Sequence, residues 1–224
     1  MPHVKIPLLC FSALILTPLA GATEPENSIE TGWLNLSQMK NAEALSQFSE
    51  LASQTDPQRE ARLGEALARL STGARTSKIR AASRRQLEAL TAENPNDDSG
   101  IAAAYYLARL RQLDEESPDP EFAIKTYRRL LADHPGHPIT EQAAPKLAIL
   151  LLYADVSADE LNQRLDEIEA LIPTLQLTHS QRDTRLVLAE ALLRLTHDHA
   201  RAYPLIVHCL KHEMIKRPAR LSVI

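Results

Sequence analysis

Residues 122–135, FAIKTYRRLLADHP, predict one amphipathic helix that ends at a proline. Four apolar side chains recur at positions i, i+4, i+7 and i+8 and therefore share one face: Ala123, Tyr127, Leu130 and Leu131. Asp119 is placed to cap the start of this helix, and Pro120 stands at the first helical position, where its missing N–H costs nothing. Pro135 and Gly136 end the helix.

The same pattern recurs along the chain. It consists of a small or apolar residue, a large residue four positions later, an apolar residue three further on, and a proline after five or six more. The copies are Ala44, Phe48, Leu51, Pro57; Ala82, Gln86, Ala89, Pro95; Ala123, Tyr127, Leu130, Pro135; and Leu161, Leu165, Ile168, Pro173. Their prolines are spaced 38, 40 and 38 residues apart, which is typical of a helical-repeat array.

This pattern resembles the second helix of a tetratricopeptide repeat, and the resemblance covers about four repeats. The pairs Leu63-Gly64 and Leu107-Ala108 match the Leu-then-small pair of the family's first helix, whereas the Trp that usually starts that helix is absent. Residues 122–148 also look like the exported subgroup, which includes the helical lipoprotein of the outer-membrane β-barrel assembly machine and the periplasmic Tol–Pal coordinator. The resemblance implies an all-α solenoid of antiparallel helix hairpins, wound as a right-handed superhelix.

The resemblance also implies a binding groove, because the first helix of each hairpin usually lines the concave side of such an array. The residues that would face the groove are Glu65, Tyr105, Arg109 and Gln112. The expected ligand is an extended peptide or a helix of another protein. The alternative is that Tyr105 belongs to the core and that the other three are ordinary surface residues.

Composition favours an all-α protein without excess positive charge. Hydrophobic residues make up 44% of the chain, charged residues 24%, and only six glycines occur. The formal net charge is -4, which does not resemble that of a nucleic-acid binder.

The first 22 residues predict a secretory signal peptide. Lys5 supplies the positive region, Ile6 to Leu16 form the apolar run, and Ala20-Gly21-Ala22 is a small-x-small cleavage site. Cys10 lacks the small residues that a lipidation site needs before it. We therefore expect a soluble secreted or periplasmic protein with a linker at 23–27, a repeat domain at 28–218 and a tail at 219–224.

The remaining helices follow from apolar spacing, caps and prolines. We expect a hairpin at 29–53 and helices at 58–71, 78–93, 99–114, 137–153, 158–172, 178–196 and from 198 or 199 to about 217. Ser157-x-x-Glu160 and Thr178-x-x-Gln181 are candidate capping boxes. Pro145 requires either a kink or a helix that starts near Ala144, and Pro204 fits the last helix only if that helix starts late.

One basic cluster stands near the predicted helix 78–93: Arg75, Lys78, Arg80, Arg84 and Arg85. It is either a solvated helical face or a contact for an anionic partner or membrane surface. Removal of the signal peptide would leave Cys209 as the single cysteine, and we expect it to be a small buried hydrophobe.

No catalytic signature is present, since the chain has no Gly-rich phosphate loop, no Gly-x-Ser-x-Gly and no His-Glu-x-x-His. We predict no catalytic residue, no metal ligand and no cofactor. The competing hypothesis is a metal site or an enzyme built on the C-terminal histidines, where His208 and His212 lie four apart on a predicted helix, with His197, His199, Cys209 and Glu213 nearby. A third hypothesis is the helical accessory part of a larger cell-wall enzyme.

Overall fold

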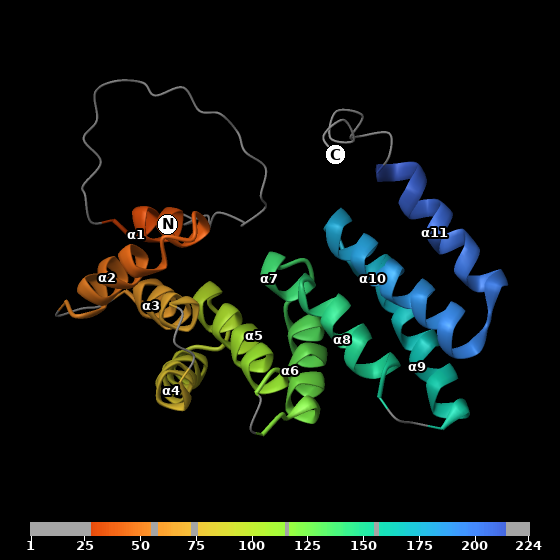
Figure 1. Ribbon diagram of the computed structural model, residues 1–224, viewed down its shortest axis with the longest axis horizontal. Helices are drawn as coiled ribbons and strands as arrows, with labels where there is room; N and C mark the ends of the chain where they lie inside the picture. The colour runs from red at the N-terminus through yellow and green to blue at the C-terminus, as the bar shows by residue number, and fades with distance from the viewer. Residues whose placement is uncertain (1–27, 55–57, 73–75, 115–116, 155–156, 214–224) are drawn as a thin grey trace. The chain divides into compact units, whose positions relative to one another are not determined.

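The computed structural model describes residues 28–54, 58–72, 76–114, 117–154 and 157–213. Every regular element within these ranges is helical, as the sequence predicted (Figure 1). The chain forms two compact units, Met1–Leu110 and Arg111–Ile224. The predicted signal peptide, the linker at 23–27 and the tail at 219–224 lie outside the described residues, and so does Arg75 of the basic cluster.

The first unit is built from helices that pack in chain order. They are α1 (Ile29–Ser37), α2 (Asn41–Ala52), α3 (Arg59–Ser71), α4 (Ser77–Glu93) and α5 (Asp98–Gln112), the last of which ends just beyond this unit. α1 packs on α2, α2 on α3 and α3 on α4, while α1 also contacts α3. This is the stacking of consecutive hairpins that the proline period predicts.

Phe48 holds the first two hairpins together. Its ring is fully buried on α2 and meets Trp33 edge-on, with 5.0 Å between the ring centroids. The ring fits because Gly32 of α1 and Gly64 of α3 carry no side chain. A Cβ at Gly32 would lie 2.7 Å from Cε1 of Phe48, and one at Gly64 would lie 2.5 Å from Cδ1 and Cζ. The Leu63-Gly64 pair is thus explained by a close approach between helices.

Arg59 ties α3 to the turn between α4 and α5. Its guanidinium donates to Asp97 at 2.7 Å and to Glu93 at 2.6 Å, and it also bonds the carbonyls of Leu90 and Asn94. Those carbonyls belong to the end of α4, where a cation is favoured. Asp97 in turn accepts from the backbone N–H of Gly100 at 2.7 Å and so caps the start of α5.

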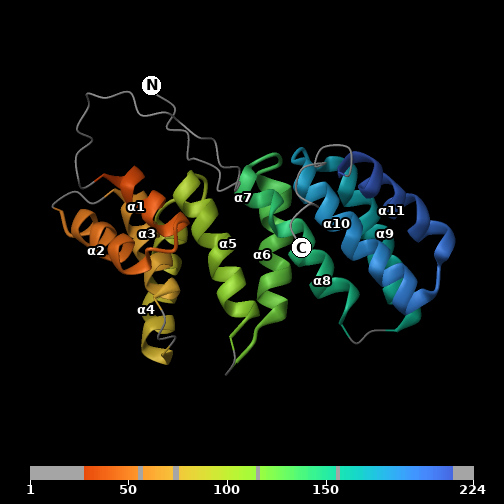
Figure 2. The same ribbon diagram turned by 45° about the horizontal axis from the view of Figure 1, so that its top comes forward.

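The helices of the second unit are also stacked on one another. Its elements are α6 (Pro120–Asp133), α7 (Pro138–Glu141), α8 (Ala143–Leu152), α9 (Ala158–Leu171), the 3₁₀ turn η1 (Ile172–Thr174), α10 (Thr178–Ala191), the π-helical turn η2 (Leu192–Thr196) and α11 (His199–Glu213). α8 packs on α6, α9 and α10, and α10 packs on α11. Figures 1 and 2 both show α10 and α11 side by side.

The helix predicted from residues 122–135 is confirmed as α6. Asp119 is its cap and accepts from the N–H of Phe122 at 3.0 Å, and Pro120 is its first residue. Ala123 and Tyr127 are fully buried, and Leu130 is nearly so. The predicted start and end of this helix agree with the structure, and so does its buried face except at Leu131, which is half-buried.

Two predicted details of the second unit are wrong. Thr178 is the first residue of α10 rather than its cap, and neither it nor Leu177 makes a side-chain cap hydrogen bond. Pro204 lies inside α11, which starts early, at His199, so its fit does not require a late start. By contrast, Ser157 caps α9 by accepting from the N–H of Glu160 at 3.3 Å. Of the two readings of Pro145, the second holds, because α8 starts at Ala143.

The cap of α10 is a buried carboxylate. Glu141 is 1% exposed, and its two oxygens accept from the N–H groups of Gln176 and Leu177, each at 2.6 Å. These N–H groups precede α10 and point at the carboxylate, so the positive end of the helix faces a negative charge. A side chain 35 residues away along the chain thus supplies the cap that Thr178 does not.

Candidate interaction surface

The four residues predicted for the groove are distributed over both units. Glu65, Tyr105 and Arg109 lie in the first unit and Gln112 in the second. Tyr105 is 5% exposed, and its ring meets Tyr106 edge-on with 5.2 Å between the centroids. Gln112 accepts a hydrogen bond from the hydroxyl of Tyr127 at 3.0 Å, and Arg109 is half-buried. A binding role for these four residues stays a prediction.

Glu65 is occupied by bonds within the first unit. Its carboxylate accepts from Ser49 of α2 at 3.0 Å, from Arg69 of α3 at 2.6 Å and from Gln86 of α4 at 2.7 Å. Gln86 also donates to the carbonyl of Arg62 at 2.9 Å. The structure thus places Glu65 where three helices meet, and a ligand at this carboxylate would compete with those three donors.

The second unit carries a surface that the sequence reasoning missed. Three large side chains are exposed on or next to α8 and α10, each of which is the first helix of a hairpin. The exposed fractions are 41% for Ile149, 44% for Tyr153 and 44% for Leu186. Each belongs to α8 or α10 or directly follows it, and these two helices pack on each other. In the family pattern such first helices line the concave side.

An ion pair completes this surface. Arg194 lies 3.2 Å from the carboxylate of Glu190, one helical turn along α10 and η2. Burial raises the pKa of Tyr153, the negative charge of Glu190 raises it further, and Arg194 lowers it. The phenol of Tyr153 therefore lies within electrostatic reach of both charged groups. We call Ile149, Tyr153, Leu186, Glu190 and Arg194 the inner patch.

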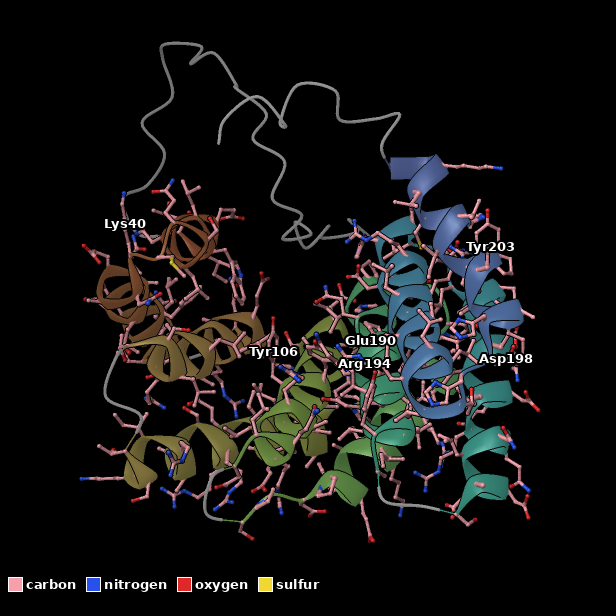
Figure 3. The ribbon with its side chains drawn as sticks, turned by 45° about the vertical axis from the view of Figure 1, so that its right-hand side comes forward. Lys40, Tyr106, Glu190, Arg194, Asp198 and Tyr203 are labelled. Atoms are coloured by element: carbon pink, nitrogen blue, oxygen red, sulfur yellow. The ribbon has the colours of Figure 1, made fainter. Side chains whose placement is uncertain are left out.

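The inner patch joins exposed aliphatic and aromatic side chains to an ion pair. Leu186 precedes Glu190 by one turn, and Ile149 precedes Tyr153 by one turn, so an apolar half adjoins a polar half. Aromatic and arginine side chains next to exposed aliphatic ones are enriched where proteins bind one another. Figure 3 shows Glu190 and Arg194 on the side of α10 that is away from Tyr203 of α11.

The spacing of the leucines explains why the patch was missed. The helix predicted at 178–196 holds several leucines, and the sequence alone does not show which of them face the core. The core uses Leu188 and Leu192, both fully buried, so Leu186 faces outward. The signal that was available is the i, i+4, i+8 spacing of Leu186, Glu190 and Arg194, which repeats for Ile149 and Tyr153.

The C-terminal histidines do not form a metal site with the side chains described. No group of three or more His, Cys, Asp or Glu in the described ranges is arranged to hold a metal ion. The side chains of His212 and Glu213 lie outside those ranges. Cys209 is 7% exposed, with its sulfur 4.0 Å from the carbonyl of Arg182, which confirms it as a buried residue.

Two further observations bear on surface contacts. Lys78 and Arg85 are exposed on α4, whereas Arg80 and Arg84 are half-buried, and contact of this cluster with an anionic surface stays a prediction. Among the helices that the structure describes, none is both long and apolar enough to cross a membrane.

Comparison with known proteins supports the fold. The sequence matches no protein-family model, and no curated protein matches it. A solved structure of MamA AMB-1 aligns with 87% of this chain and 94% of its own, with a TM-score of 0.52 and 13% identity. MamA is a tetratricopeptide-like helical-repeat protein, so the chain shares the helical-repeat fold, and at this identity the likeness concerns the fold alone.

Proposed function

We propose that this protein is an exported scaffold that binds a segment of another protein on the inner patch, within a cell-envelope complex. The observation that carries the proposal is the inner patch itself. Five side chains on, or shortly after, α8 and α10 leave apolar surface exposed beside an ion pair. Exposed apolar side chains that cluster in this way are more often part of an interaction site than of an ordinary solvated surface.

The helical-repeat fold supports this proposal in general terms. Repeat arrays present extended surfaces, and their ligands are usually extended peptides or helices. The apolar half of the inner patch, formed by Ile149, Tyr153 and Leu186, suits a leucine or aromatic side chain of such a ligand. Glu190 and Arg194 would orient it by hydrogen bonds at the polar half.

The proposal of export rests on residues 1–22 alone. Their charged start, apolar run and small-residue cleavage site are those of a secretory signal peptide. N-terminal sequencing of protein recovered from its own cells tests this directly. We expect the mature chain to begin at Thr23, and recovery of the chain starting at Met1 would contradict export by this signal.

Site-specific photocrosslinking tests the inner patch. A benzophenone amino acid placed at Leu186 is expected to crosslink one defined protein in intact cells. The same amino acid at Leu210 is the matched control, because this leucine is 51% exposed on α11 of the same unit but lies outside the patch. Tyr153→Ala should abolish the crosslink from position 186. Identical products from both positions, or none from position 186, would refute binding at the patch.

A further inference from the structure

A cavity of about 580 Å³ lies in the second unit, between the start of α9 and the turn that joins α10 to α11. The cavity is open to solvent, with Ala158, Asn162 and Leu195 exposed at its wall, and its volume falls within the range of about 300–1,000 Å³ that is typical of ligand-binding pockets. Its lining residues are Ala158, Leu161, Asn162, Leu195, Thr196, Asp198 and Arg201. None of them belongs to the inner patch.

The π-helical turn η2 shapes this cavity. At the end of this turn the N–H of Asp198 donates a hydrogen bond to the carbonyl of Leu192 at 2.9 Å, and His197 has a left-handed conformation with φ of 55°. The wider turn keeps Leu192 fully buried and leaves Leu195 42% exposed at the cavity wall. Single π-turns within α-helical segments often occur at functional sites.

The wall combines an apolar part with hydrogen-bond acceptors. Ala158, Leu161 and Leu195 supply the apolar part. Asp198 accepts from the N–H of Arg201 through Oδ1 at 3.0 Å, while its Oδ2 meets no donor among the described residues. Thr196 donates its hydroxyl proton to the carbonyl of Leu192 at 3.0 Å, which leaves its lone pairs available for a donor in the cavity.

The lining itself carries one cation, Arg201, and one anion, Asp198, and two further carboxylates lie beside it. Arg201 is the cation of the lining, and its guanidinium bonds both Asp166, at 2.8 Å, and Glu169. These two carboxylates, which lie outside the lining, exceed the positive charge of Arg201. The carboxylate of Asp198 adds a further negative charge, bonded only to a backbone N–H within the described ranges.

We propose that this cavity binds the side chain of an arginine in a peptide segment of a partner protein. The aliphatic part of an arginine suits Ala158, Leu161 and Leu195, since long cationic side chains bury their methylene groups along apolar surface. Its guanidinium would donate to Asp198 in a charge-assisted hydrogen bond and to Thr196 and Asn162 with its remaining N–H groups. Figure 3 shows Asp198 beside α11 and Arg194 on the opposite side of α10, so this site is separate from the inner patch.

A peptide titration followed by NMR tests the proposal. The probe is an acetylated and amidated heptapeptide of alanines with one central arginine, added to the full chain labelled with ¹⁵N. We expect shifts of the backbone amide signals of Leu195, Thr196 and Asp198. A peptide with central norleucine, which lacks the charge, should bind at least about tenfold more weakly, as expected for the loss of one charge-assisted hydrogen bond. Equal binding of the two peptides, or no shift at these amides, would overturn the proposal.

Two variants separate the cavity from general electrostatic attraction. Asp198→Asn keeps a side chain that can cap α11 but removes the charge, and it should weaken binding of the arginine peptide about tenfold. Asp133→Asn removes the same charge from an exposed position of α6 that is outside the lining, and it should change the affinity less than twofold. Equal weakening by both variants would contradict a specific site.

A third variant blocks the space and leaves every charge in place. Ala158→Phe adds a ring at the cavity wall, on the first residue of α9, and should abolish the amide shifts. Circular dichroism and thermal unfolding establish that this variant and Asp198→Asn retain the helical fold. If the folded Ala158→Phe variant binds the arginine peptide as the unaltered protein does, the cavity is not the binding site.

Discussion

Gly64→Ala should destabilise the first unit, although alanine is the better helix former. An alanine within a helix is favoured over glycine by about 1 kcal/mol. The new methyl group, however, would lie 2.5 Å from Cδ1 and Cζ of Phe48. The ring cannot withdraw freely, because Gly32 stands against it from α1 and the ring is fully buried.

The balance of these two effects gives the magnitude. Overpacking a core costs about 1–3 kcal/mol, and the confined ring points to the upper end of that range. After the gain in helix propensity, we expect a loss of about 2 kcal/mol in the free energy of unfolding. Urea unfolding followed by circular dichroism measures this loss.

A double-mutant cycle gives the decisive control. Phe48→Ala alone should cost about 3–5 kcal/mol, because it empties a fully buried site. In that background the methyl group of Gly64→Ala meets no ring, so the same substitution should become stabilising by about 1 kcal/mol. The explanation that Gly64 leaves room for the Phe48 ring would be refuted by either of two results. One is an equal effect of Gly64→Ala in both backgrounds, and the other is a stabilising effect of Gly64→Ala in the otherwise unaltered protein.

Three further predictions concern other parts of the two units. Glu141→Gln should lower the free energy of unfolding by about 2 kcal/mol, since a carboxamide has one acceptor oxygen for the two N–H groups that Glu141 now binds, and urea unfolding tests this. Arg59→Lys should cost about 1 kcal/mol and speed hydrogen exchange at the start of α5, because a lysine cannot reach Asp97, Glu93 and two carbonyls together; unchanged exchange there would contradict the assigned role. Burial raises the pKa of Tyr105 to about 12 from 10.0, so the unfolded chain releases this proton first as pH rises. The contribution of the buried, protonated Tyr105 to the free energy of unfolding is therefore complete below pH 10. It falls by about 2–3 kcal/mol as the pH rises towards 12, and Tyr105→Phe should make the free energy of unfolding less dependent on pH over this interval.

Local signals in the sequence predicted the helices well. The cap at Asp119, the proline at 120 and the glycine after 135 define α6 by chemistry within a few residues, and Ser157 does the same for α9. These signals work because orphan N–H groups at a helix start need an acceptor nearby. Where the acceptor lies far along the chain, the local sequence does not predict the cap. Glu141 caps α10 from 35 residues away, so no residue near Thr178 indicates it.

The half-buried network around Glu65 was unpredictable for a related reason. From the sequence, Glu65 is a charged residue on an amphipathic helix, and such residues usually face water. Its actual surroundings follow from how α2, α3 and α4 meet, which brings Ser49, Arg69 and Gln86 to one carboxylate. Each of these residues is ordinary alone, and only their convergence gives Glu65 its role in the first unit.

The surface of the second unit depends on a choice among too many leucines. Within ten residues the chain offers Leu186, Leu188, Leu192, Leu193 and Leu195, and several helical phases satisfy that spacing equally. Packing selects Leu188 and Leu192 for the core, and the π-turn then directs Leu195 to the cavity wall. Leu186 is left on the opposite surface, in the inner patch. The two proposed sites, the inner patch and the cavity, therefore each include one exposed leucine of this segment that packing within the unit leaves uncovered.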